Sequence, residues 1–270
     1  MSEVGNAGQQ ESQAAGIARR MDGQWGTPGV QAVCRALLEG LKAVLGEKLA
    51  GLYVFGAVAF PDAAPTGDID LHALLNGVLT DREKSGVQSL HSSLAQAFPP
   101  LGGELDAYYL LLDDARRTTR PRHQLAADVV DESWALHREH IRAGRCIVLY
   151  GPDPKEVYPA ASWPELEDAL HGELRYVEDH LDDYPDYCIL NLCRLMYSFK
   201  TREVVVSKAA AATWAFETFP EWRRAIETAR WSYARQATAR DKEFMRSEVA
   251  DLFRFACDRI RESREWAGNE

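Results

Sequence analysis

The sequence predicts an α/β domain at residues 27–158 followed by an all-α helical domain at residues 159–264. In the first region, short apolar runs rich in β-branched and aromatic residues alternate with helical patterns, whereas the second region is helical almost throughout. Between them lies Gly-Pro-Asp-Pro at 151–154, a run of turn-forming residues that is typical of a domain boundary. Residues 1–26 are rich in Gly, Gln, Ser and Ala and lack periodicity, which predicts a disordered tail.

Turn and cap signals place the individual elements. Thr27 with Pro28 is typical of a helix start and Gly46 of its end. Thr80 with Glu83 forms a capping box that opens a second helix. The other elements of the first domain are expected as strands at 52–55, 69–75, 104–112 and 145–150, and a helix at 131–143. Helices of the second domain are expected at about 164–182, 186–202, 208–219, 220–237 and 240–263.

Composition and charge restrict the class of protein. The chain has 270 residues, a net charge of −10 and a pI near 5.3, which argues against a nucleic-acid partner because such partners require a basic surface. No run is long and apolar enough to span a bilayer, and the N-terminus lacks a secretory signal pattern. The five cysteines lack metal-ligand spacing and are typical of buried thiols in a reducing compartment. We therefore expect a cytoplasmic, monomeric protein without a membrane partner.

Two aspartates are the strongest functional signal in the chain. Asp68 and Asp70 stand at the start of an apolar, strand-like run, and because strand side chains alternate they point to one face. Two carboxylates on one face repel each other unless a cation lies between them, and such oxygen ligands suit Mg²⁺ held together with substrate phosphates. A hairpin with solvated acidic ends is the simpler interpretation, but it does not explain why the aspartates begin an apolar strand.

A third carboxylate is expected on the next strand. Glu104 and Asp106 share one face of the run at 104–112. Either carboxylate is a candidate for a general base.

The glycine and the aspartates together carry a family resemblance. The pattern of Gly56, an interval of eleven residues and Asp68-x-Asp70 resembles the nucleotidyltransferase superfamily, and the chain as a whole resembles the streptomycin/spectinomycin adenylyltransferases of the aminoglycoside adenylyltransferase family. The resemblance implies a polymerase-beta-like α/β nucleotidyltransferase domain with a mixed sheet, followed by a helical bundle. It also implies that Asp68 and Asp70 hold Mg²⁺ on ATP. The family's apolar-carboxylate-apolar pattern falls on residues 105–107, so the resemblance favours Asp106 as the base that activates the acceptor hydroxyl. Glu104 is the reserve for that role and is counted with the residues that contact the acceptor.

The chain departs from the family pattern at two positions. The serine that follows the first glycine in the family is Ala57 here, and the serine before the first aspartate is Gly67. Backbone amides at Gly56 and Ala57 can still bind phosphate oxygens. The loss of two hydroxyl donors is expected to weaken nucleotide binding by roughly 0.5 to 1.5 kcal/mol each unless other donors replace them.

The second domain carries the rest of the resemblance. Arg194, Lys208 and Tyr233 match family positions that contact ATP, although singly they would be ordinary surface or core residues. For the acceptor, the resemblance implies roles for Trp134 and for three carboxylates near the start of the expected helix at 186–202. The three are Asp182, Asp183 and Asp186, which by default form a solvated interhelical loop.

These residues predict an Mg²⁺-dependent nucleotidyltransferase that moves AMP from ATP to a hydroxyl of an aminoglycoside or aminocyclitol antibiotic. An acidic protein suits a cationic small-molecule acceptor. Two alternatives stay open. One is a non-catalytic relative that binds a nucleotide or another small molecule, supported by Ala57 and Gly67. The other is an enzyme that adenylylates a different acceptor.

Overall fold

The computed structural model describes residues 19–20, 25–62, 68–126 and 128–267. The chain forms two compact units. The first comprises residues 1–59, 68–130 and 137–160, and the second comprises 60–67, 131–136 and 161–270. Each unit is described by itself.

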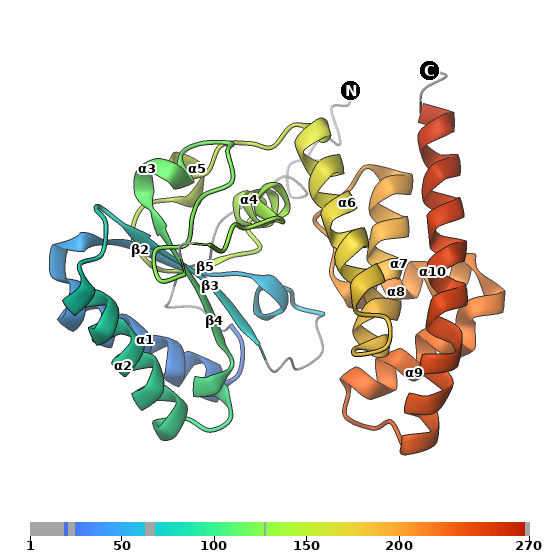
Figure 1. The fold of residues 1–270 in the computed structure, drawn as a ribbon, viewed down its shortest axis with the longest axis horizontal. Coiled ribbons are helices and arrows are strands. Elements are labelled where there is room, and N and C mark those ends of the chain that lie inside the picture. Colours follow the sequence, from blue (N-terminus) through green and yellow to red (C-terminus); the bar gives the residue numbers. More distant parts are fainter. Residues whose placement is uncertain (1–18, 21–24, 63–67, 127, 268–270) are drawn as a thin grey trace, which may run out of the picture. The chain divides into compact units, whose positions relative to one another are not determined.

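A mixed sheet forms the centre of the first unit (Figure 1). Within the described part of the chain its strands are β1 (Arg19–Arg20), β2 (Leu49–Val54), β3 (Ile69–Leu75), β4 (Leu105–Leu111) and β5 (Ile147–Tyr150). They lie in the order β1-β5-β2-β3-β4, with parallel pairs at both edges and antiparallel pairs in the middle. The expected α/β fold with a mixed sheet is confirmed. β1 lies within residues 1–26, where the composition predicts a tail.

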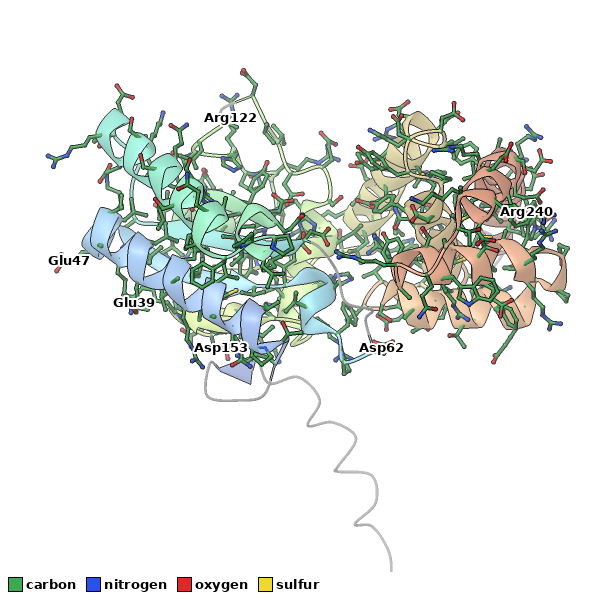
Figure 2. The ribbon with its side chains drawn as sticks, turned by 90° about the horizontal axis from the view of Figure 1, so that it is seen from below. Glu39, Glu47, Asp62, Arg122, Asp153 and Arg240 are labelled. Atoms are coloured by element: carbon green, nitrogen blue, oxygen red, sulfur yellow. The ribbon has the colours of Figure 1, made fainter. Side chains whose placement is uncertain are left out.

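Two long helices cover one face of this sheet (Figure 1). α1 (Pro28–Leu45) begins after Thr27, whose Oγ1 accepts from Val30 N at 3.3 Å, and α2 (Asp81–Ala97) begins at the predicted capping box. Apolar side chains of both helices pack with Ile69, Leu71 and Ala73, the alternate residues of β3 that point to this face. Glu39 lies on the exposed side of α1 (Figure 2).

Three short helices of the chain follow β4: α3 (Leu112–Ala115), α4 (Trp134–Arg142) and α5 (Pro154–Val157).

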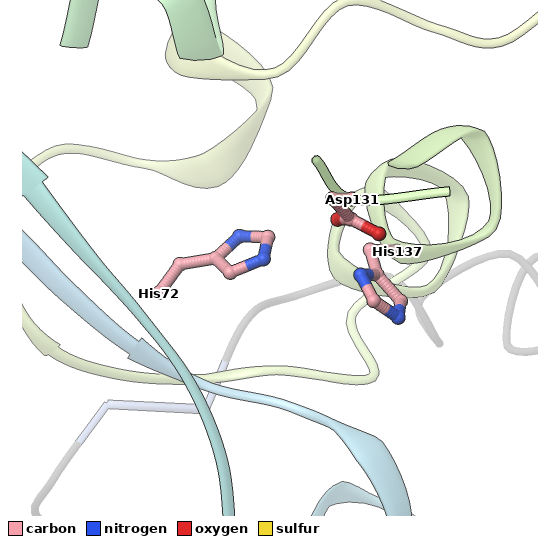
Figure 3. A group of neighbouring side chains, drawn as sticks. All are labelled: His72, Asp131 and His137. Atoms are coloured by element: carbon pink, nitrogen blue, oxygen red, sulfur yellow. The ribbon is translucent and has the colours of Figure 1, made fainter. Parts of the chain in front are cut away.

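The other face of the sheet carries polar side chains. His72 of β3 is fully buried, its Nδ1 lies 3.2 Å from Tyr158 Oη, and its ring packs against Phe55 and His137. Figure 3 shows the two histidines; Asp131, drawn with them, belongs to the second unit. Short 3-10 turns occur at Gly46–Lys48, Gly56–Ala59 and Leu101–Gly103.

The second unit is a helical bundle (Figure 1). Its helices are α6 (Trp163–Asp179), α7 (Pro185–Thr201), α8 (Lys208–Thr218), α9 (Arg223–Tyr233) and α10 (Ala239–Ala267), with a 3-10 turn at Pro220–Trp222. α7 packs against each of the other four helices and is apolar on most sides, as a central helix must be. None of the helices in the described residues has the length and apolarity that a membrane span requires.

Candidate active site

Two of the predicted carboxylates are direct neighbours across strands. β3 and β4 pair in parallel, and Asp70 is the register partner of Asp106. Register partners in a parallel ladder lie about 4.8 Å apart and point to the same face. That face is opposite to α1 and α2, because the intervening residues Ile69 and Leu71 pack against those helices. The sheet therefore brings a carboxylate from each strand to one place.

The other two predicted carboxylates lie one residue before each strand. Asp68 precedes β3, Glu104 precedes β4, and Ile69 N donates to Glu104 O at 2.8 Å, which ties the two strand starts together. Asp68, Glu104 and Asp106 are exposed, and Asp70 is half-buried. Accessible carboxylates on adjacent strands form a donor set that fits Mg²⁺, which binds through a few carboxylates and keeps the rest of its shell for water and phosphate.

Gly56 lies directly against this site. It follows β2, has φ +64°, and a Cβ placed on it would come within 1.7 Å of Asp70 Oδ2. Only glycine allows both the left-handed backbone and the approach of the main chain to the carboxylate. Ala57 continues into the 3-10 turn Gly56–Ala59, whereas Gly67 lies outside the described residues. The role of the Gly56 and Ala57 amides in binding phosphate stays a prediction.

Gly56→Ala is expected to lower the free energy of unfolding by more than the strain of an alanine at positive φ would. Gly46 offers a matched control, because it also has a positive φ of 55° but has open space where a Cβ would stand. Gly46→Ala should lower the free energy of unfolding by about 1 to 2 kcal/mol. Gly56→Ala should cost about 1 to 3 kcal/mol more, since Asp70 must move. Equal losses in denaturant unfolding of the two variants would show that Gly56 and Asp70 are not in contact.

In the second unit, the side chains of Lys208 and Tyr233, which the resemblance implies to contact ATP, lie next to each other. Lys208 is the first residue of α8, after Ser207, whose Oγ accepts from Ala210 N at 2.9 Å and donates to Asp62 Oδ2 at 2.6 Å. Lys208 Nζ lies 3.4 Å from Tyr233 Oη and 3.9 Å from the centre of the Tyr187 ring. The contact with Tyr187 is a cation–π interaction that the sequence analysis missed. Tyr187 could have been found from the sequence, because it lies two helical turns before Arg194 and therefore on the same face of the helix.

Arg194 is held by a buried carboxylate. Its Nη2 lies 3.2 Å from Glu173 Oε2, and the two side chains are only 21% and 15% exposed. Glu173 also accepts from Asn191 Nδ2 at 3.0 Å and from Ser133 Oγ at 2.5 Å. Arg194 is thus part of a network rather than an ordinary surface residue. Nothing in the local pattern of α6 marks Glu173, because its partners come from other segments of the chain.

The predicted acceptor residues differ in accessibility. Trp134 is only 1% exposed, so in this structure it offers no open ring face for a substrate. Asp186 accepts from Ser232 Oγ at 2.5 Å and from Tyr187 N, so its carboxylate is already engaged within the second unit. Asp182 and Asp183 are exposed in the turn between α6 and α7.

An aromatic stack surrounds that turn. The rings of Tyr176 and His180 are stacked with centres 4.1 Å apart, and His180 and Tyr184 are stacked at 6.0 Å. Tyr176 and Tyr184 are 46% and 55% exposed, which is high for large side chains. The exposed Asp182 and Asp183 lie in the chain between His180 and Tyr184, and carboxylates together with exposed aromatic rings suit a cationic, ring-shaped molecule.

Comparisons with known proteins bear on both units. Residues 156–259 match the family model of the aminoglycoside adenylyltransferase C-terminal domain. A comparison with curated protein sequences finds no match. Among solved structures, the chain is similar to the spectinomycin adenyltransferase AAD(9) from Enterococcus faecialis, crystallised with ATP and spectinomycin, at a TM-score of 0.69 and 16% identity over 85% of this chain and 98% of that one. Residues 156–259 are therefore similar to the C-terminal domain of aminoglycoside adenylyltransferases, and the fold of the chain is that of AAD(9), with an α/β domain followed by a helical domain.

Proposed function

We propose that this protein transfers AMP from ATP to a hydroxyl group of an aminoglycoside or aminocyclitol antibiotic, with Mg²⁺ as cofactor. The observation that carries the proposal is the register of Asp70 and Asp106, which places two carboxylates on one face with Gly56 against one of them. The family of the C-terminal domain and the fold shared with AAD(9) support the same reaction.

Each of the proposed site residues has its own role in the reaction. Asp68 and Asp70 would hold Mg²⁺, which neutralises charge on the triphosphate when bound. Asp106 would take the proton of the acceptor hydroxyl as its oxygen forms a bond to the α-phosphorus. The bond between the α-phosphorus and the bridging oxygen breaks, and pyrophosphate leaves. Arg194 and Lys208 would stabilise the negative charge on the phosphates.

The acceptor is proposed to be cationic on the basis of charge and aromatic exposure. The chain carries a net charge of −10, and Asp182 and Asp183 lie in the chain between His180 and Tyr184, whose rings are stacked. Amino groups of an aminoglycoside or aminocyclitol would pair with these carboxylates, and the ring stack would cover its apolar face. The choice among such acceptors is the finer part of the proposal.

One observation favours a second candidate, a nucleotide-binding relative without turnover. Ala57 stands where the family serine would donate to a phosphate oxygen. One hydrogen-bond donor to the nucleotide is therefore missing, and the affinity for nucleotide is expected to be lower. The complete carboxylate set argues against this candidate. Crowded acidic residues repel each other and lower the stability of the protein when no metal lies between them.

Turnover with a panel of acceptors separates the two candidates. Pyrophosphate release would be measured with ATP, Mg²⁺ and each of spectinomycin, streptomycin and several other aminoglycosides. Acceptor-dependent release by the wild type is the expected result. ATP binding without release for any acceptor would instead establish the non-catalytic relative, and Ala57→Ser would then be the first variant to examine for recovery.

Tyr187 offers a specific prediction for nucleotide affinity. Its ring faces Lys208 Nζ, and burial raises the pKa of its hydroxyl, so the side chain stays neutral and serves as an aromatic platform. Tyr187→Leu should raise the Michaelis constant for ATP about two- to tenfold, the worth of a cation–π contact of this kind. Tyr187→Phe, which keeps the ring, should stay near the wild type. Equal effects of the two variants would show that the ring does not position Lys208.

A further inference from the structure

The strand that carries Asp106 has an outer edge, because β4 is the last strand of the sheet in the described chain. The main-chain groups of Asp106 and Tyr108 face β3, so those of Ala107 and Tyr109 alternate outward. Residues 122–126 and 128–130 form a segment along this edge: Gln124 N donates to Tyr109 O at 2.8 Å, and His123 Nε2 lies 3.2 Å from Ala107 O. Both outward carbonyls therefore have a partner.

The hydrogen bonds of His123 define its protonation state. Nδ1 accepts from the backbone N–H groups of Leu125, at 2.9 Å, and Ala126, at 3.2 Å. A nitrogen that accepts carries no proton, so in the neutral ring the proton lies on Nε2. Since a carbonyl oxygen can only accept, Nε2–H donates to Ala107 O. A second proton on Nδ1 would place an N–H against two backbone N–H groups.

The groups around His123 reinforce this state. Its ring packs edge-on against Tyr108, with centres 4.6 Å apart, and lies 6.0 Å from the Tyr109 ring. Burial lowers the pKa of the imidazole, against smaller opposing effects of the Ala107 carbonyl and of the Asp106 carboxylate. His91 of α2 is the other histidine nearby, and it is hydrogen-bonded to Tyr109 Oη at 2.8 Å.

The covering segment is attached to itself as well as to the strand. His123 N donates to Val129 O at 3.3 Å, and Arg122 forms a bridge with Val130. Figure 2 shows Arg122 pointing outward from this segment. The same connection carries the exposed Arg116 and Arg117 just after β4. The segment therefore has backbone contacts of its own besides those with β4.

We propose that His123 is a positioning residue that clasps residues 122–126 to the outer edge of the Asp106 strand, and that uptake of a proton by His123 opens the clasp. This property goes beyond the proposed function, since it concerns the structure of the first unit without substrate. The clasp is closed while the ring is neutral and opens when both ring nitrogens carry a proton.

The sign of the pH dependence follows from the direction of the shift. The closed state has a lowered pKa, whereas the open state titrates near the ordinary value of 6.5. Below that value the open state binds more protons, so the equilibrium constant for closing falls by up to about tenfold per pH unit until the lowered pKa is reached. Above pH 6.5, the equilibrium constant for closing does not depend on the protonation of His123.

Hydrogen exchange of the substrate-free protein tests the clasp. The amides of Leu125 and Ala126 would be followed from about pH 8 to about pH 5 and corrected for intrinsic exchange, with the β2–β3 ladder as the reference for global opening. We expect their protection to fall about tenfold per unit below the ordinary histidine range, while the reference amides stay protected.

Three variants make the result specific. His123→Asn keeps a side-chain acceptor for the amide two residues on and does not titrate, so the protection of Leu125 should no longer depend on pH. His123→Ala should lose protection at every pH. His91→Gln, which removes the neighbouring histidine, should keep the pH dependence. Protection that is constant with pH in the wild type, or a pH dependence that survives in His123→Asn, would overturn the proposal. Because no substrate is used, either result is independent of the proposed function.

Discussion

Asp70→Asn should abolish Mg²⁺-dependent nucleotide binding and reduce turnover by at least about a thousandfold. The carboxylate lies between Gly56 and Asp106, so its loss removes a metal ligand from the centre of the site. The melting temperature of the metal-free protein should be equal or higher, because one of several mutually repelling carboxylates is removed. Calorimetric titration of ATP with and without Mg²⁺, together with thermal unfolding, would measure both effects.

A charge-matched variant controls for the change in net charge. Asp113→Asn removes the same charge from a side chain of the first unit that is 83% exposed, and it should leave Mg²⁺-dependent binding unchanged. Strong destabilisation of metal-free Asp70→Asn would contradict the account, because it would assign Asp70 a structural role.

Asp106→Asn should retain ATP binding and lose turnover by about 10² to 10⁴, the usual contribution of a general base. Asp106 is exposed on the strand next to Asp70, so an amide of the same size fits without repacking. The amide cannot accept the proton of the acceptor hydroxyl. Binding would be measured by calorimetry and turnover by pyrophosphate release, on the same protein samples.

Glu104→Gln is the matched comparison for this variant. Glu104 lies before β4 rather than in register with Asp70, so its loss should change turnover much less than that of Asp106. Unchanged turnover in Asp106→Asn with a large loss in Glu104→Gln would transfer the role of base to Glu104.

The first unit illustrates what the sequence can predict. Ile69–Leu75 forms a strand with the predicted bounds, and the strand Leu105–Leu111 lies within the predicted run. Alternation along each strand is a local property, so the face of Asp70 relative to Ile69 and Leu71 follows from the sequence, whereas its register with Asp106 joins two strands and does not. The helix expected at 131–143 begins later, at Trp134, because the Asp131 carboxylate accepts from Ser133 N and forms a turn first.

The contacts between helices of the second unit could not be predicted from local sequence patterns. Helix existence follows from periodicity, but the pairing of Arg194 with Glu173 joins α7 to α6, and the contact of Lys208 with Tyr187 joins α8 to α7. Such contacts depend on how helices pack, which a single sequence does not specify. The clasp of His123 on Ala107 is of the same kind, since it joins a connecting segment to a strand.

Transfer of isotope from ATP is the most direct measurement of AMP transfer by this protein. The protein would be incubated with Mg²⁺ and spectinomycin or streptomycin, once with ATP labelled at the α-phosphate and once with ATP labelled at the γ-phosphate. We expect the α label to appear in the acceptor and the γ label to appear in pyrophosphate, and both transfers to be lost in Asp70→Asn. Label in the acceptor from γ-labelled ATP, or none from either ATP with any aminoglycoside or aminocyclitol, would contradict it.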